Sequence, residues 1–179
     1  MMRSSITIQK TFRVFHTLTK IAMILSFICA GLAHLGTLCG IVWYHGGTVI
    51  GADREMLLTL TGTDGLREMI AVLWVYTIVA LTDGILLVHA LGYLKMELAD
   101  GTPFTHRGAD RIRGLGIRTI VLPLVAAILI AVVYAVFDLP GNAVNHWDNA
   151  YSVTMGIVLI LASLIFRYGA ELGEDSDKK

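Results

Sequence analysis

The sequence is poor in charged residues. Only 16% of its 179 residues are charged and 55% are hydrophobic, whereas soluble domains average roughly 25% and 45–50%. This composition argues against a soluble globular domain. Lysine plus arginine and aspartate plus glutamate each number 14, so no global charge excess draws the chain to nucleic acid, and we expect no direct nucleic-acid binding.

Cysteines are scarce and catalytic motifs are absent. Cys29 and Cys39 lie ten residues apart in one apolar run, which on a helix separates them by about 15 Å, too far for a disulfide. The sequence has no H-E-x-x-H zinc motif, no G-x-S-x-G nucleophile motif and no phosphate-binding glycine loop. We therefore expect neither an enzyme nor a metal or cofactor site.

The sequence does contain four long apolar runs, at residues 21–44, 69–94, 119–137 and 150–166. A helix needs about 20 such residues to cross a bilayer, with a range of roughly 17–25. Only a helix satisfies every backbone polar group within its own segment there. The predicted fold is all-α, a bundle of four transmembrane helices at about 21–44, 67–99, 106–137 and 150–172 within a domain spanning residues 21–172.

The segments outside this domain receive simpler interpretations. Residues 1–20 place Ile8, Phe12, Phe15 and Leu18 near helical spacing, with Lys10 and Arg13 interspersed among them. This pattern favours an amphipathic helix on the inner membrane surface. Residues 173–179 are expected to form a cytoplasmic tail. The stretch 45–65 contains five glycines and is interpreted as a solvated loop.

The basic residues predict the orientation. Twelve of the 14 lysines and arginines fall on one side of the four runs, which leaves only Arg54 and Arg67 on the other. Positive charge marks the cytoplasmic side. We therefore predict a multi-pass membrane protein with both termini on the cytoplasmic side.

Small residues recur at three- or four-residue spacing along the apolar runs. They are Gly36 and Gly40 in the first, and Ala80 and Gly84 in the second. Such spacing lets helix backbones approach closely in lipid. The third run has a similar seam at Ala127, Ala131 and Ala135. Packing within the bundle is the simplest reading, and a homo-oligomer contact through Gly36 and Gly40 is the alternative.

A basic segment opens the third helix. Thr105 suits an N-cap, and Arg107, Arg111 and Arg118 share one face at positions i, i+4 and i+11, with Arg113 in the same segment. The stripe can face the anionic headgroups of the lipid bilayer, at about 1 kcal/mol per basic residue. The alternative and more specific hypothesis is that the stripe binds a cytoplasmic protein partner.

Three segments around these helix ends carry a family resemblance. They are Arg111–Gly116, Ile165–Leu172 and the run Glu97-Leu98-Ala99-Asp100-Gly101-Thr102-Pro103-Phe104-Thr105. With them the chain resembles the bacterial membrane proteins of domain-of-unknown-function family 2975. The resemblance is specific in roughly the second half of the chain.

The resemblance implies a four-helix bacterial membrane protein with no assigned biochemical activity. Members often look like neighbours of a small helix-turn-helix regulator, which implies a cytoplasmic protein partner of that kind. The resemblance carries over no catalytic residue. Members also often look extended after the fourth helix, whereas this sequence has only seven residues after Leu172.

Two polar residues lie deep in the apolar runs. By helical rise, Asp83 is about 17 Å and His34 about 20 Å from the cytoplasmic ends of their helices, so we expect them near one level. A charged carboxylate there is costly unless it is paired, protonated or next to water. Asp83 and His34 are therefore candidates for a proton or ion site, with a structural hydrogen bond between helices as the alternative.

Two functional hypotheses follow. The first is a non-catalytic sensor or regulatory membrane protein that meets partners through its basic segment. The second is a small transporter or channel subunit that uses Asp83. A pore needs polar residues repeated along one helix face, and the helix neighbours Val79, Ala80 and Leu87 are apolar, which favours the first hypothesis.

Overall fold

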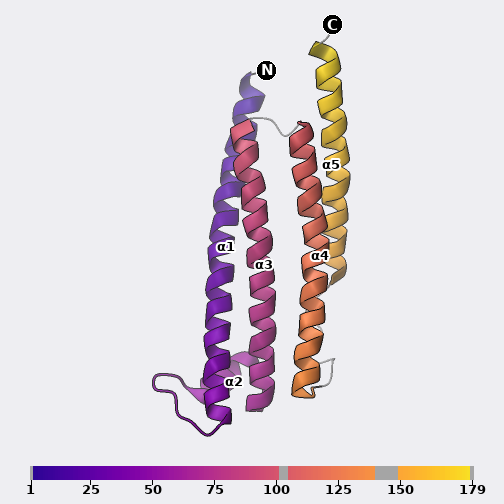
Figure 1. Ribbon diagram of the computed structural model, residues 1–179. Coiled ribbons are helices and arrows are strands. Elements are labelled where there is room, and N and C mark those ends of the chain that lie inside the picture. The colour runs from indigo at the N-terminus through magenta and orange to yellow at the C-terminus, as the bar shows by residue number, and fades with distance from the viewer. Residues whose placement is uncertain (1, 101–104, 140–148, 178–179) are drawn as a thin grey trace. The chain divides into compact units, whose positions relative to one another are not determined.

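The computed structural model describes residues 2–100, 105–139 and 149–177, and within these ranges the chain forms helices and no strand (Figure 1). The helices are α1 (Met2–Tyr44), α2 (Arg54–Thr61), α3 (Leu66–Asp100), α4 (His106–Phe137) and α5 (Asn149–Asp177). The all-α prediction is confirmed for these residues. Four helices, α1, α3, α4 and α5, are long and apolar enough to cross a membrane, as in a multi-pass membrane protein.

α1 begins much earlier than predicted. We expected a separate surface helix over residues 1–20, but one helix of 43 residues runs from Met2 to Tyr44. The sequence explains this continuity, since neither proline nor glycine occurs before Gly31 and nothing ends the helix. At 1.5 Å per residue α1 is about 65 Å long, roughly twice the hydrocarbon thickness of a bilayer.

The expected solvated loop contains a helix, α2. Its N-cap is Asp53, whose Oδ1 accepts hydrogen bonds from the backbone N–H groups of Glu55 and Met56 at 3.0 and 3.5 Å. Its C-cap is Gly62, with φ 66° and ψ 32°, a left-handed conformation that glycine adopts at little cost. The sequence analysis missed this capped helix because the five glycines of residues 45–65 favoured a loop.

The other helix limits agree with the predictions to within a few residues at most ends. Thr105 is the N-cap of α4, since its Oγ1 accepts a hydrogen bond from the Gly108 N–H at 2.9 Å. α5 continues past the predicted limit of 172 to Asp177, so most of the expected tail is helical. The stretch between the third and fourth apolar runs contains Pro140, Gly141 and Asn142, which predict a turn, but residues 140–148 lie outside the described parts of the chain.

The chain packs as two compact units. The unit that we call the basic unit comprises residues 1–23, 85–123 and 148–179, and the loop unit comprises residues 24–84 and 124–147. The first and last described residues, Met2 and Asp177, both belong to the basic unit. Among the described residues, the same unit contains ten lysines and arginines, namely Arg3, Lys10, Arg13, Lys20, Lys95, Arg107, Arg111, Arg113, Arg118 and Arg167, and the loop unit contains two, Arg54 and Arg67.

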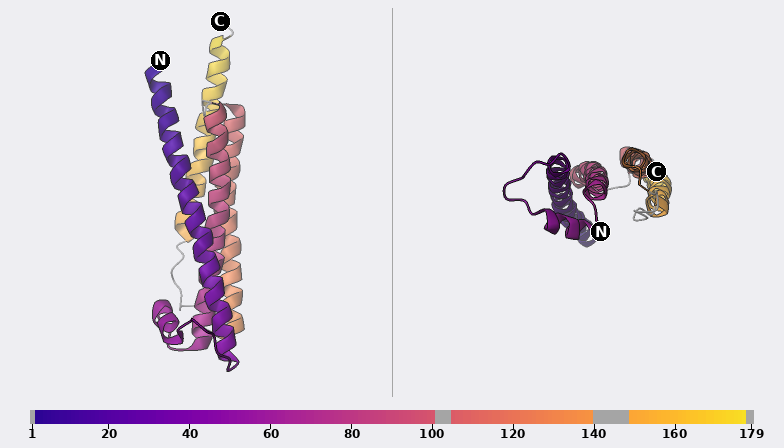
Figure 2. Two further views of the ribbon diagram at one scale, coloured as in Figure 1. Left: turned by 90° about the vertical axis from the view of Figure 1, so that its left-hand side faces the viewer. Right: turned by 90° about the horizontal axis from the view of Figure 1, so that it is seen from below.

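In the loop unit, α1 and α3 pack side by side through small residues (Figure 2). A Cβ added to Gly40 would lie 2.7 Å from Cγ1 of Ile70, and one added to Gly36 would lie 3.2 Å from Cδ1 of Leu73. These contacts bury one stretch of α3, where the core side chains are Met69, Ile70, Ala71, Val72, Leu73 and Val75.

The same helix pair meets again through the predicted small residues of α3. Ser26 Oγ donates a hydrogen bond to the Ala80 carbonyl oxygen at 2.8 Å. A Cβ on Gly84 would lie 3.0 Å from the ring of Phe27. Gly36, Gly40, Ala80 and Gly84 therefore all face the α1–α3 contact within one chain.

In the basic unit, α4 and α5 cross closely through glycine. A Cβ on Gly116 would lie 2.8 Å from the carbonyl oxygen of Gly156, and a Cβ on Gly156 equally close to that of Gly116. The predicted alanine seam of this helix is wrong, because Ala131 and Ala135 are exposed. Spacing alone did not reveal which face of α4 meets a neighbour.

Large apolar side chains cover the outside of the long helices. Ile128, Val136, Leu164 and Ile165 are 65%, 70%, 58% and 66% exposed. Continuous apolar surfaces of this kind are rare on monomeric soluble proteins and are suited to contact with lipid.

Candidate functional site

The basic unit contains a polar groove of about 440 Å³ between α3 and α4, which we call the basic groove. It is lined by Val88, His89, Gly92, Tyr93 and Met96 of α3 and by Asp110, Arg111, Gly114, Leu115 and Arg118 of α4. The lining residues recur at helical spacing on both helices, so one face of each helix supplies the groove. Four titratable groups besides Tyr93 therefore converge on one space.

The structure sorts the four predicted arginines into two groups. Arg111 and Arg118 line the basic groove, because seven residues return a helix to nearly the same face. Arg107 and Arg113 are exposed and do not line it. Two of the four predicted arginines therefore line a concave site.

A buried carboxylate lies next to this groove. Glu97, one turn after Tyr93 on α3, is only 3% exposed. Glu97 and Arg111 are both close enough to act electrostatically on the Tyr93 hydroxyl. Arg111, which is half-buried, therefore belongs to a partly buried cluster with Tyr93 and Glu97.

Sequence reasoning did not assign His89 and Tyr93 to the site. Their spacing of four residues, continued by Met96, marks a single α3 face. This spacing indicates a site only when the α4 face opposite it is also known. Which helices pair with each other cannot be inferred from a single sequence.

The prediction that His34 and Asp83 share a level is wrong. His34 instead packs edge-on against Trp74, with ring centroids 5.6 Å apart and an interplanar angle of 74°. Trp74 precedes Asp83 by nine residues, about 14 Å along α3. The error arose because distances counted from the limits of two apolar runs do not give the register between the helices, which here brings Phe27 against Gly84.

Asp83 itself lies on an open face of α3. Its side chain is exposed, and no hydrogen bond or ion pair joins it to any residue within the described parts of the chain. Leu81 and Ile85 beside it in sequence are 42% and 41% exposed. The carboxylate is therefore not part of the α1–α3 contact.

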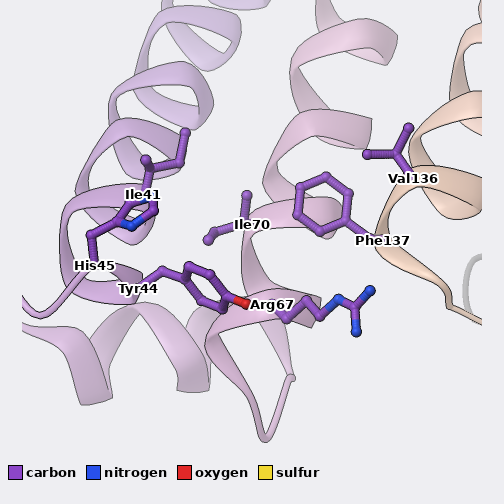
Figure 3. A pocket seen from close by; sticks show the side chains of 7 residues that line it. All are labelled: Ile41, Tyr44, His45, Arg67, Ile70, Val136 and Phe137. Atoms are coloured by element: carbon purple, nitrogen blue, oxygen red, sulfur yellow. The ribbon is translucent and has the colours of Figure 1, made fainter.

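A second polar space, which we call the end pocket, lies in the loop unit. It encloses about 370 Å³ and is lined by Ile41, Tyr44, His45, Arg67, Ile70, Val136 and Phe137. Figure 3 shows side chains from the ends of α1 and α4 and the beginning of α3 around this space. The sequence analysis treated Arg67 only as a member of the minority basic side and did not predict the pocket.

No group of three or more His, Cys, Asp or Glu side chains suited to a metal ion occurs among the described residues. No protein-family model, curated protein or solved structure matches the chain. The resemblance to family 2975 stays a prediction.

Proposed function

We propose that the chain is a non-catalytic regulatory protein of the bacterial cytoplasmic membrane that binds a cytoplasmic protein partner at the basic groove. The observation that carries this proposal is the convergence of Arg111 and Arg118 with His89 and Tyr93 in one groove. Asp110 also lines the groove, where it is outnumbered by the two arginines. Because arginine forms paired hydrogen bonds with carboxylates, the surface suits an acidic patch.

The orientation in this proposal follows from charge. Twelve of the 14 basic residues fall on one side of the four apolar runs, and Arg54 and Arg67 fall on the other. The positive-inside rule then puts the basic unit at the cytoplasmic side, with both termini inside. A partner of the basic groove is accordingly a cytoplasmic protein, and the family resemblance points to a small helix-turn-helix regulator.

The test compares two arginine variants in tagged full-length protein recovered from native membranes after mild crosslinking. Arg118→Gln removes a cation from the groove, and Arg113→Gln removes one from the exposed surface of the same segment. Each leaves eleven basic residues on the predicted inner side, so the orientation is preserved.

We expect the Arg118→Gln variant to lose most of a partner that the wild type and Arg113→Gln recover equally. Equal recovery of the partner by all three proteins would show that the groove is only a solvated surface and would contradict the proposal. Equal loss in both variants would indicate nonspecific attraction by charge and would also contradict the proposal.

The exposure of Asp83 favours a second candidate, a transporter or channel subunit. A carboxylate in a membrane-spanning stretch must be protonated, paired or next to water, and Asp83 has no partner within the described chain. Another copy of the chain would provide a partner for this carboxylate, and a water-filled path would hydrate it. Its helix neighbours Val79 and Leu87 are apolar, so Asp83 does not continue into a polar track, and the regulatory proposal ranks first.

A further inference from the structure

An apolar groove continues from the end pocket in the loop unit. This groove, which we call the acyl groove, encloses about 380 Å³ and is lined by Trp74, Ile78, Leu129, Val132, Val133, Val136 and Phe137. Val136 and Phe137 line both spaces. The two spaces therefore form one site with a polar end and an apolar stem.

The polar end is built around a single cation. Arg67 is exposed, and within the described residues its side chain makes no ion pair or hydrogen bond, not even with its sequence neighbours Asp64 and Glu68. The other polar groups of this end are the Tyr44 hydroxyl and the His45 ring, which can both donate hydrogen bonds. These groups are complementary to an anion and above all to phosphate, which arginine binds through two parallel hydrogen bonds.

The stem has the character of an acyl-chain site. Its lining from Leu129 to Val136 covers about 11 Å along α4, and its side chains are aliphatic or aromatic. Leu129, Val132 and Val136 are 49%, 53% and 70% exposed, so the stem is open along its side. A ligand can enter laterally from the bilayer, and the part of a chain beyond the groove remains in lipid.

The depth of the site fits a lipid headgroup. Arg67 is the second residue of α3, and the apolar run begins at Met69, so the guanidinium lies where the hydrocarbon ends and phosphates are found. We infer that the end pocket and the acyl groove together bind one anionic phospholipid, with its phosphate at Arg67 and an acyl chain against Trp74 and Ile78.

This inference rests on the proposed function only where the lipid is treated as a signal. α3 and α4 line both the lipid site and the basic groove. Under the proposed function, the lipid bound in the membrane is the signal, and the cytoplasmic partner at the basic groove responds to it. Binding of the lipid itself requires neither a partner nor a particular orientation. Failure of one proposal therefore leaves the other standing.

Trp74 provides a direct reporter of the acyl groove. Substituting Trp43→Phe and Trp147→Phe leaves it as the single tryptophan. The full chain is placed in phosphatidylcholine vesicles that contain equal small fractions of phosphatidylglycerol or phosphatidylcholine brominated on the acyl chain. Bromine quenches only nearby tryptophan, so the comparison measures which lipid occupies the groove.

We expect brominated phosphatidylglycerol to occupy the site about five-fold more than brominated phosphatidylcholine, the factor equivalent to about 1 kcal/mol for one basic residue near phosphate. Arg67→Gln abolishes this preference. The matched control Arg54→Gln, on exposed α2, keeps it. Equal quenching by both lipids in the parent protein, or a preference that survives Arg67→Gln, would overturn the inference.

A second pair of variants tests the stem. Val133→Phe fills the acyl groove and should lower quenching by the anionic lipid, whereas Ile128→Phe, on an exposed position that does not line the groove, should not. Unchanged quenching in Val133→Phe places the lipid elsewhere and contradicts the inference. A brominated fatty acid that displaces phosphatidylglycerol would replace the phospholipid with a free carboxylate amphiphile and overturn the assignment.

Discussion

Gly116 and Gly156 face each other where α4 crosses α5, each leaving only 2.8 Å between an added Cβ and the carbonyl oxygen of the other. The obstacle to a side chain is backbone, which cannot rotate away. We predict that Gly116→Ala lowers the free energy of unfolding in detergent by about 1–3 kcal/mol, because the helices must move apart.

Gly114→Ala on the same helix is the control, since a Cβ there meets nothing within 4 Å. It should be neutral or stabilising by up to about 1 kcal/mol, because alanine is the better helix former. Similar stability changes in both variants would show that the α4–α5 crossing is looser than described.

The second prediction concerns the α1–α3 contact at Gly40. A Cβ there would lie 2.7 Å from Ile70 and 2.9 Å from Met69, two side chains that are almost fully buried. Gly40→Ala should destabilise the monomer by about 1–3 kcal/mol without changing its oligomeric state, whereas Gly31→Ala, with open space around it, should not. Loss of a dimer at unchanged monomer stability would assign Gly40 to a contact between copies.

The third prediction tests the orientation by cysteine labelling in a chain whose Cys29 and Cys39 are replaced by alanine. A cysteine at the exposed position Asp64 should react with a membrane-impermeant reagent in intact cells. One at Glu171, also exposed, should react only after permeabilisation, because the basic side is retained inside. The opposite pattern would invert the topology.

The fourth prediction separates the two readings of Asp83. Because Asp83 makes no hydrogen bond or ion pair within the described residues, an amide should replace a carboxylate without a transport role at a cost of at most about 1 kcal/mol and retain the cellular phenotype. A carboxylate that exchanges protons cannot be replaced in this way. We expect the Asn variant to stay active, and a stable but inactive Asn variant, compared with Asp83→Leu, would favour transport.

Most of the fold could be predicted from the apolar runs and their flanking residues. Thr105 predicted where α4 begins because a cap is a local interaction. The beginning of α1 was misplaced because a change of polarity near Lys20 does not end a helix when no residue breaks it. α2 was missed although Asp53 and Gly62 bracket one short helix, a cap pair that is visible in the sequence.

The sites were less predictable than the helices. Arg111 and Arg118 could be placed on one helix face from their spacing, but His89 and Tyr93 joined them only through the pairing of α3 with α4. The same holds for Arg67, whose pocket includes residues from α1 and α4. Pairings between helices depend on close contacts such as Gly40 with Ile70, which composition and periodicity do not specify.

The most direct test of the central claim is photocrosslinking in living cells from inside the basic groove. Met96 lines the groove and is 47% exposed, whereas Ile117 of α4 is 45% exposed and does not line it. A photoreactive residue at Met96 should give one discrete crosslink to a cytoplasmic protein, which Arg118→Gln removes, and Ile117 should not give that product. No protein crosslink at Met96, or the same crosslink at both positions, would contradict a partner site in this groove.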